Sequence, residues 1–172
     1  MKKTIGITAL SAISLILIGH AVGVRGNLSE SAPIGLWIKR PITSELKKGM
    51  MIGVCPPPTV PVVRLFSANG TLPYGQCPHT NVALLLKPIR AFPGDIVTIK
   101  KGNNVTVNGE HLSNSSALDS LPGWPDGEYI VRPGEVWIFS SYSDKSFDSR
   151  YFGPVKVSEI QGAALPLLTK DF

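Results

Sequence analysis

The stretch NVALLLKPIRAFPGD, residues 81–95, places a lysine inside an apolar run and closes that run with Pro-Gly-Asp. The run predicts a β-strand, because it is short, apolar and followed by turn-forming residues. Gly94 permits a tight turn, and the side chain of Asp95 can cap it. Lys87 is then either buried in the strand or extended to water at the end of the strand, and the pattern favours neither position.

Short apolar or alternating runs recur along the rest of the chain, as GLWIKR, GMMIGVC, VVRLFS, DIVTIKKGNNVTVNGEHL, EYIVRPGEVWIFS and GPVKVSEIQGAALPLL. Gly, Pro and Asn separate these runs, which is typical of β-strands. VTIKKGNNVTVNG predicts a hairpin that turns near residues 102–104. After residue 26, only SELKK, residues 44–48, has a short helical pattern. NSSALDSLPGWPDG, residues 114–127, has the composition of an exposed loop. The fold class is therefore mainly β, in one domain.

The N-terminal segment TIGITALSAISLILIGHAVGV, residues 4–24, contains no Asp, Glu, Lys or Arg. As a helix its 21 residues would span about 31 Å, close to the thickness of one bilayer core. The alternative is a cleaved signal peptide, with Gly19 and Ala21 as small residues near the cleavage site. We expect a single transmembrane anchor over residues 1–25 and a domain over residues 26–172 outside the cytoplasm.

The charge of the chain argues against nucleic acid as a partner. The formal net charge is +5, but Lys2, Lys3 and Arg25 flank the apolar N-terminal run. Residues 26–172 keep 14 Lys and Arg against 12 Asp and Glu, so this domain lacks the basic surface that nucleic-acid binding needs.

The two cysteines fit an oxidising compartment. Cys55 and Cys77 both lie in Pro-flanked, loop-like segments, and a disulfide between them would close a loop of about 20 residues. The alternative is a pair of free, half-buried thiols. His79 and His111 have no paired ligands at close spacing, so we predict neither a metal site nor a cofactor.

The segment SESAPIGLWIKR, residues 29–40, presents two serines just after the apolar N-terminal run. A serine nucleophile needs a base, and His79 and His111 have the sequence setting of ordinary surface histidines. A lysine base must be held neutral by burial, and lowering its pKa from about 10.4 to about 8 takes roughly 3 kcal/mol. Lys87 is the candidate, because Val, Ala and three Leu precede it and Pro-Ile follows it, whereas several other lysines lie in polar turns or at the hairpin. Those turn lysines are Lys47, Lys48, Lys100 and Lys101.

Four segments in sequence order resemble the type I signal peptidases. KPIRAFPGD resembles their K-R-x-x-x-x-P-G-D box, and DKSFDSRYFGPV resembles their N-S-x-D-S-R-x-x-G-x-V box. SAPIGLW matches the S-x-P-x-G-[IL]-[YW] form of the TraF-type conjugal-transfer signal peptidases, and LPYGQCPHT matches the LP-x-G-x-CP segment of that branch. The resemblance covers residues 29–155 and implies a signal-peptidase-like β-fold behind the N-terminal transmembrane helix.

The resemblance also implies roles for individual residues. Ser31 would be the nucleophile and Lys87 the general base of a Ser-Lys dyad, and Ser29 would help to bind the oxyanion. Pro33 fixes its own φ and biases Ala32 toward extended conformations, which can aim Ser31 outward.

Three residues of the last box complete the implied site. Ser146 would orient the base, and Asp148 and Arg150 would form an ion pair near the site. For Asp148 a direct catalytic role and a purely structural one are both open. The chain also departs from the signal peptidases, with Pro88 in place of their Arg and Ser140-Ser141 in place of their Gly-Asp.

The function that the resemblance implies is a membrane-anchored serine endopeptidase on the periplasmic side of the bacterial inner membrane. Its substrate would be the precursor of a conjugative pilus subunit, bound by β-augmentation and then either hydrolysed or cyclised. The alternatives are a general type I signal peptidase and a non-catalytic structural component of a conjugation channel. The sequence leaves the oligomeric state open.

Overall fold

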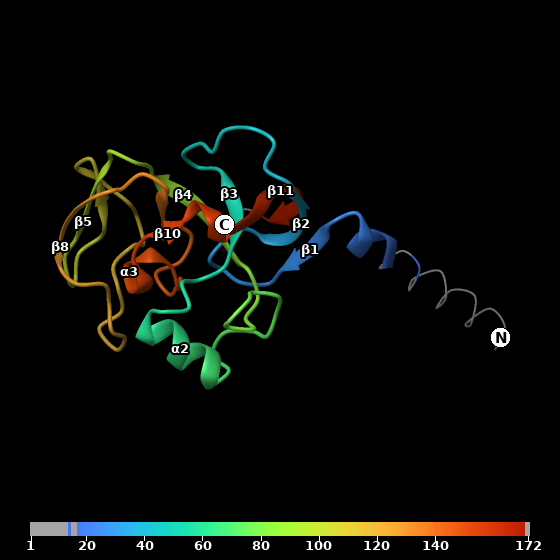
Figure 1. Ribbon diagram of the computed structural model, residues 1–172, viewed down its shortest axis with the longest axis horizontal. Helices are drawn as coiled ribbons and strands as arrows, with labels where there is room; N and C mark the ends of the chain where they lie inside the picture. The colour runs from blue at the N-terminus through green and yellow to red at the C-terminus, as the bar shows by residue number, and fades with distance from the viewer. Residues whose placement is uncertain (1–13, 15–16, 171–172) are drawn as a thin grey trace.

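The computed structural model describes residue 14 and residues 17–170 (Figure 1). Residues 17–21 are helical, and a turn at residues 22–23 leads from them into the first strand. Most of the predicted anchor over residues 1–25, namely residues 1–13 and 15–16, lies outside the described residues. Within the part that is described, no helix has the length and apolar character needed to cross a bilayer.

A seven-stranded sheet forms the larger part of the domain, and its hydrogen-bonded neighbours are antiparallel. The domain is therefore mainly β, as predicted. The strands in their order across the sheet are β1 (Val24–Asn27), β2 (Ile34–Arg40), β11 (Ile160–Lys170), β3 (Met51–Val54), β4 (Leu85–Ala91), β9 (Glu135–Ile138) and β10 (Val155–Lys156).

A smaller four-stranded sheet lies at the end of the domain away from the N-terminus (Figure 1). Its order is β7 (Glu110–His111), β6 (Thr106–Val107), β5 (Ile96–Ile99) and β8 (Gly127–Ile130). Strands β5 and β6 pair antiparallel, Val97 with Val107, so the predicted hairpin is confirmed. The turn before β5 also has the predicted form: Gly94 has a φ of +91°, and the backbone N–H of Phe92 donates to Asp95 Oδ2 at 2.8 Å.

Strand β9 separates two hydrophobic clusters, because successive side chains of a strand point to opposite faces. Val136 and Ile138 pack in one cluster with residues of β3 and β4, including Ile52 and Ile89. Trp137 faces the other cluster, which is built on the smaller sheet. Full burial of such side chains contributes about 1.5–3 kcal/mol each, so β9 ties the two sheets into one domain.

The region VVRLFS is a helix and not the strand that its apolar run predicted. Helix α2 (Pro61–Ala68) begins with a proline, whose fixed φ suits the first helical turn. Val62 and Val63 are buried, and Phe66 packs beside them on the same core, which is helical spacing. The SELKK segment, in contrast, forms no helix. Among the helices whose full extent the structure describes, the only other α-helix is the single turn α3 (Ser149–Phe152).

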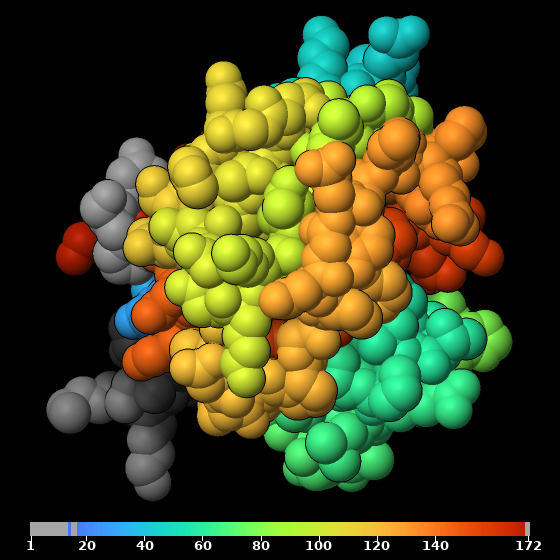
Figure 2. All heavy atoms as spheres, turned by 90° about the vertical axis from the view of Figure 1, so that its left-hand side faces the viewer, coloured from blue at the N-terminus to red at the C-terminus, as the bar shows by residue number. Residues whose placement is uncertain are grey.

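The predicted exposed loop, residues 114–127, has no regular structure until β8 begins, but it is not fully exposed. Ser115 is buried, and Leu118 and Leu121 are half-buried. Ala117 and Leu121 pack on the larger core beside Phe66 of α2. Figure 2 shows this loop in gold next to α2 in teal, although about 50 residues separate them in the chain.

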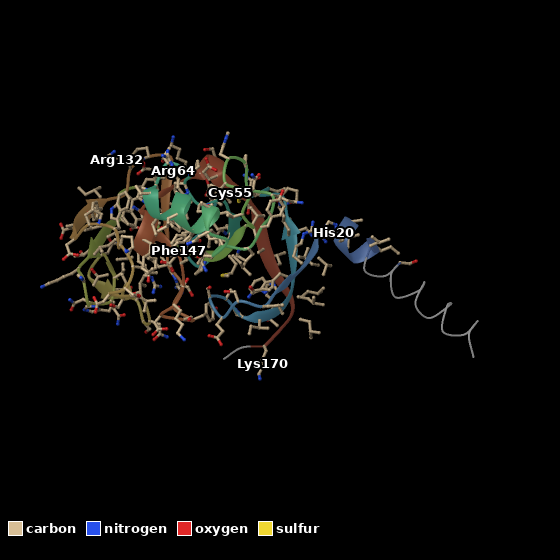
Figure 3. All side chains as sticks on the ribbon, turned by 90° about the horizontal axis from the view of Figure 1, so that it is seen from below. His20, Cys55, Arg64, Arg132, Phe147 and Lys170 are labelled. Carbon is tan, nitrogen blue, oxygen red and sulfur yellow. A yellow bond between two sulfur atoms is a disulfide. The ribbon has the colours of Figure 1, made fainter. Side chains whose placement is uncertain are left out.

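Cys55 and Cys77 form the predicted disulfide, with 5.4 Å between their Cα atoms. Cys55 follows β3 directly, and the bridged loop carries α2 (Figure 3). Both cysteines are buried and pack with Leu72 and Val82 in a small cluster of their own. The bridge therefore attaches α2 and the residues after it to the main sheet.

The disulfide predicts a measurable share of the stability. Replacing both cysteines by alanine should lower the free energy of unfolding by about 2–4 kcal/mol, because the unfolded chain then gains the entropy of an open 22-residue loop. Urea unfolding of the double variant against the unreduced parent measures the loss. Alkylation and mass measurement of the unreduced parent provide the control, and two alkylated thiols there would contradict the bridge.

Candidate active site

The described residues enclose a cleft of about 830 Å³ between the β1–β2 loop, the start of β4 and helix α2. Ser29, Ser31 and Lys87 all line it, so the structure brings these three predicted residues to one cavity. Much of the remaining wall is apolar, and its aromatic members are Phe66, Phe147 and Tyr151. Phe147 lies beside α2 (Figure 3), with its ring centroid 5.1 Å from that of Phe66.

The two serines of the β1–β2 loop contact each other directly. Ser29 Oγ lies 2.7 Å from Ser31 Oγ, and the backbone N–H of Ser31 donates to Ser29 Oγ at 3.3 Å. Ser29 is exposed and Ser31 is half-buried. The hydroxyl of Ser29 therefore lies within hydrogen-bond distance of both the Oγ and the backbone N–H of Ser31. An acyl-transfer site would use these two groups of Ser31, one as the nucleophile and the other to bind the oxyanion.

Asn27 organises this loop, and the sequence interpretation missed it. Its Nδ2 donates to the carbonyls of Ser29, Ala32 and Pro33 at 2.9, 3.0 and 3.1 Å. Its Oδ1 accepts the backbone N–H of Ser29 at 3.1 Å. Asn is typical of such side-chain-supported turns, so its place just before two serines was the available signal.

The glycine of the SAPIGLW segment, Gly35, cannot be replaced by a larger residue, for a steric reason. Gly35 has a φ of +142°, and a Cβ there would collide with the backbone oxygen of Leu168 on the paired strand β11. Only glycine therefore allows β2 to pair with β11 directly after Pro33, and this pairing fixes the end of the loop that carries Ser31.

Lys87 is buried, with 4 % of its surface exposed. It lies on β4 opposite Ile52 of β3, and no carboxylate among the described residues lies within ion-pair distance of its Nζ. Burial lowers the pKa of Lys87 from 10.5 to about 8; the charge of Asp148 opposes this shift, and that of Arg150 adds to it. The structure thus resolves the open question from the sequence, because Lys87 is buried and does not extend to water.

Asp148 and Arg150 form a fully buried ion pair behind the cleft. Arg150 Nε and Nη2 donate to Asp148 Oδ1 and Oδ2 at 2.9 and 3.0 Å. Asp148 also caps α3 by accepting the backbone N–H of Arg150 at 3.2 Å. Neither residue lines the cleft, so Asp148 has no direct access to a bound peptide in this structure.

The guanidinium group of Arg150 holds several separate loops together. It donates to four backbone carbonyls, those of Asn114, Ser116, Ser140 and Asp144. These bonds satisfy a buried cation that would otherwise be costly.

Ser146 is also fully buried, and its Oγ has no hydrogen-bond partner in the part of the chain that the structure describes. An unpaired buried hydroxyl costs about 1–3 kcal/mol. Ser146 is not among the residues that line the cleft, so its implied role in orienting the base stays a prediction.

The charged residues on the wall of the cleft are both lysines, Lys87 and Lys145. His79 lines a different cavity, together with Arg64 on α2, and His111 is exposed on β7. Neither histidine is therefore placed to act as the base for Ser31. Within residues 17–170, no three His, Cys, Asp or Glu side chains gather at a distance suited to a metal ion.

The chain belongs to the peptidase S26 family, the family of the signal peptidases, whose model matches residues 1–168. It is 34 % identical to a conjugal transfer protein TraF of Agrobacterium fabrum, over 99 % of each chain. It is also 32 % identical to a plasmid transfer protein TraF of Escherichia coli, over 98 % of this chain and 96 % of that protein. Membership of this family supports a serine peptidase.

A signal peptidase I from Enterococcus faecalis is similar at 18 % identity, with a TM-score of 0.41 over 70 % of this chain and 97 % of that one. A likeness at this level carries no argument about the site.

The pKa of Lys87 predicts an alkaline rise in peptidase activity. Below pH 8 the group is mainly an ammonium ion and cannot accept a proton, so kcat/KM should rise with pH and level off above about pH 8. Asp148→Asn removes the charge that raises the pKa of Lys87 but keeps Arg150, which lowers it, so the midpoint should move to lower pH. The measurement is kcat/KM against pH on a peptide that spans the cleavage site.

The matched control is Asp119→Asn, because the Asp119 side chain is 82 % exposed and its loss should leave the midpoint unchanged. Circular dichroism of each variant checks that it is folded. A midpoint near 6.5 that disappears when His79 or His111 is replaced would mean that a histidine is the base.

Proposed function

We propose that this chain is a membrane-anchored serine endopeptidase that processes the precursor of a conjugative pilus subunit. One observation carries the proposal: Ser31 and Lys87 line the same cleft, and burial brings the pKa of Lys87 to about 8. A lysine with that pKa is partly neutral near physiological pH and can act as a base. The relatives named conjugal or plasmid transfer protein TraF support a role in conjugation.

The proposed reaction begins when neutral Lys87 takes the proton of Ser31 Oγ. The oxygen of Ser31 then adds to the scissile carbonyl carbon, and Lys87 passes the proton to the leaving amine. The developing oxyanion would be bound by the hydroxyl of Ser29 and the backbone N–H of Ser31. In the free protein these two groups bond to each other, so the substrate carbonyl replaces a contact that already exists.

The acyl-enzyme on Ser31 is then resolved by a second nucleophile. Water gives hydrolysis, whereas an amine of the same precursor gives a cyclic product. In both cases Lys87 accepts the proton that the attacking water or amine loses. Lys87 then gives this proton to the Ser31 oxygen as the acyl bond breaks.

The substrate peptide is proposed to bind as an added strand beside the start of β4. Residues 85–88 pair with β3 on one side, whereas β9 pairs only with Ile89 and Ala91 on the other. Within residues 17–170 no strand pairs with this second edge of Leu85–Lys87, so we propose that the substrate peptide pairs there.

The cleft continues into a neighbouring cavity of about 260 Å³, which is compatible with an extended peptide. The two cavities share five lining residues: Gly26, Asn27, Ala83, Leu84 and Leu86. A Cβ on Gly26 would meet no atom within 4 Å, so this wall leaves room for small substrate side chains.

The proposed location is the outer face of the bacterial inner membrane, with residues 1–25 as the anchor. Several leucines near the N-terminal end of the larger sheet are strongly exposed, which fits a surface close to lipid. These are Leu28, Leu165, Leu167 and Leu168, with 53–88 % of their surface accessible. The disulfide fits an oxidising compartment.

The proposal predicts that each member of the dyad is indispensable. Ser31→Ala and Lys87→Met should each abolish processing of a co-expressed pilin precursor, because removing one member of a catalytic unit costs nearly the whole chemical rate. Ser29→Ala should retain activity lowered by about 10²–10³, the cost of one oxyanion donor. Mass spectrometry of the precursor and its products measures all three and separates a linear product from a cyclic one.

Ser113→Ala and Lys101→Ala are the matched controls, because both side chains are exposed and outside the cleft. Normal processing by Ser31→Ala would exclude the proposed nucleophile. Equal processing of unrelated secretory precursors would indicate a general signal peptidase, and no processing by the parent protein would favour a structural component.

A further inference from the structure

Ser140 is fully buried two residues after the end of β9 and contacts the loop that carries Ser31. Its Oγ donates a hydrogen bond of 2.6 Å to the backbone carbonyl of Ser31 and accepts the backbone N–H of Tyr142 at 3.1 Å. A carbonyl can only accept, so the direction of the first bond is fixed. The single proton of the Ser140 hydroxyl is thereby committed to the Ser31 carbonyl.

The backbone of Ser140 is held by the buried ion pair. Its N–H donates to Asp148 Oδ2 at 3.0 Å, and its carbonyl accepts from Arg150 Nη2 at 2.9 Å. Both neighbouring groups are fully buried, so Ser140 has little freedom to move. One residue thus connects the ion pair to the backbone of Ser31.

The Ser31 carbonyl has no comparable support from its own segment. Asn27 bonds the carbonyls of Ser29, Ala32 and Pro33 but not that of Ser31. Among the described residues, the bond from Ser140 is the only hydrogen bond that joins residues 28–33 to a distant part of the chain. The same peptide unit is held at its other end within the loop, where the Ala32 N–H donates to the Ser29 carbonyl at 3.4 Å. The bond from Ser140 ties this peptide unit to the rest of the domain, and with it the backbone from which the Ser31 side chain projects.

We propose that Ser140 is a positioning residue, which transmits the rigidity of the Asp148–Arg150 pair to the Ser31 nucleophile. The inference rests on the proposed function, because it requires Ser31 to be the nucleophile. It also gives Asp148 an indirect part in catalysis, through Ser140 and not through contact with the substrate.

The test compares Ser140→Ala with Ser115→Ala. Ser115 is the matched control because it is equally buried and also donates to one backbone carbonyl and accepts one backbone N–H, in its case those of Leu112 and Val105. Both variants should lose similar thermal stability. Only Ser140→Ala should lower kcat, by about 10- to 100-fold with KM within twofold, because the nucleophile is misplaced while the binding groove is intact.

A second measurement, the affinity for two peptide inhibitors, tests the position of Ser31 without turnover. A peptide aldehyde that ends at the cleavage site binds through addition of Ser31 Oγ to its carbonyl, whereas the matching peptide alcohol binds through the groove alone. In Ser140→Ala the aldehyde should bind about tenfold more weakly and the alcohol unchanged. Ser140→Thr keeps the hydroxyl and should restore kcat to within about threefold.

The outcomes separate this inference from the proposed function. If Ser31→Ala is inactive while Ser140→Ala has the kcat and aldehyde affinity of the parent, the positioning role is wrong and the dyad stands. If Ser140→Ala and Ser115→Ala lose kcat equally, or if KM and alcohol affinity change as much as kcat, the role is structural. If Ser31→Ala remains active, both proposals fail.

Discussion

The buried pair of Asp148 and Arg150 is the interaction on which the site depends. Two charges out of water are tolerated only when their remaining donors and acceptors are also satisfied, and here they are. The bonds of Arg150 reach four carbonyls in the loops near residues 114–116, 140 and 144, so the pair organises the backbone behind the cleft. Removing one partner of such a pair costs about 3–5 kcal/mol, which would affect all of these loops together.

The same pair determines how Lys87 can function. A carboxylate next to a buried lysine would stabilise the ammonium form and return its pKa toward the usual range. Because Arg150 neutralises Asp148, the opposing effects of the two residues on Lys87 leave desolvation dominant. The shift to about 8 means that the site disfavours the ammonium form of Lys87 over its neutral form by roughly 3 kcal/mol. Its place on β4, paired with β3, keeps the side chain buried.

The sequence predicted those features that depend on local chemistry. The turn at Gly94-Asp95, the β5–β6 hairpin, the disulfide and the mainly β class all follow from short patterns. The motifs also singled out Ser29, Ser31 and Lys87, which line one cleft, while their roles there stay predictions. Features that depend on distant partners were not predictable. VVRLFS became a helix because its Val and Phe residues pack on a core that the run itself does not reveal. Ser140 meets Ser31 across 109 positions, and no local pattern reports such a contact.

Helix α2 and the residues after it supply one whole side of the cleft, through Phe66, Thr71, Leu72 and Pro73. All four lie inside the loop closed by Cys55 and Cys77. In a reducing environment that loop has no covalent closure and is held by packing and backbone hydrogen bonds, so the wall of the cleft that it supplies is attached less firmly. We therefore expect this wall to become fixed only in a compartment that forms the disulfide.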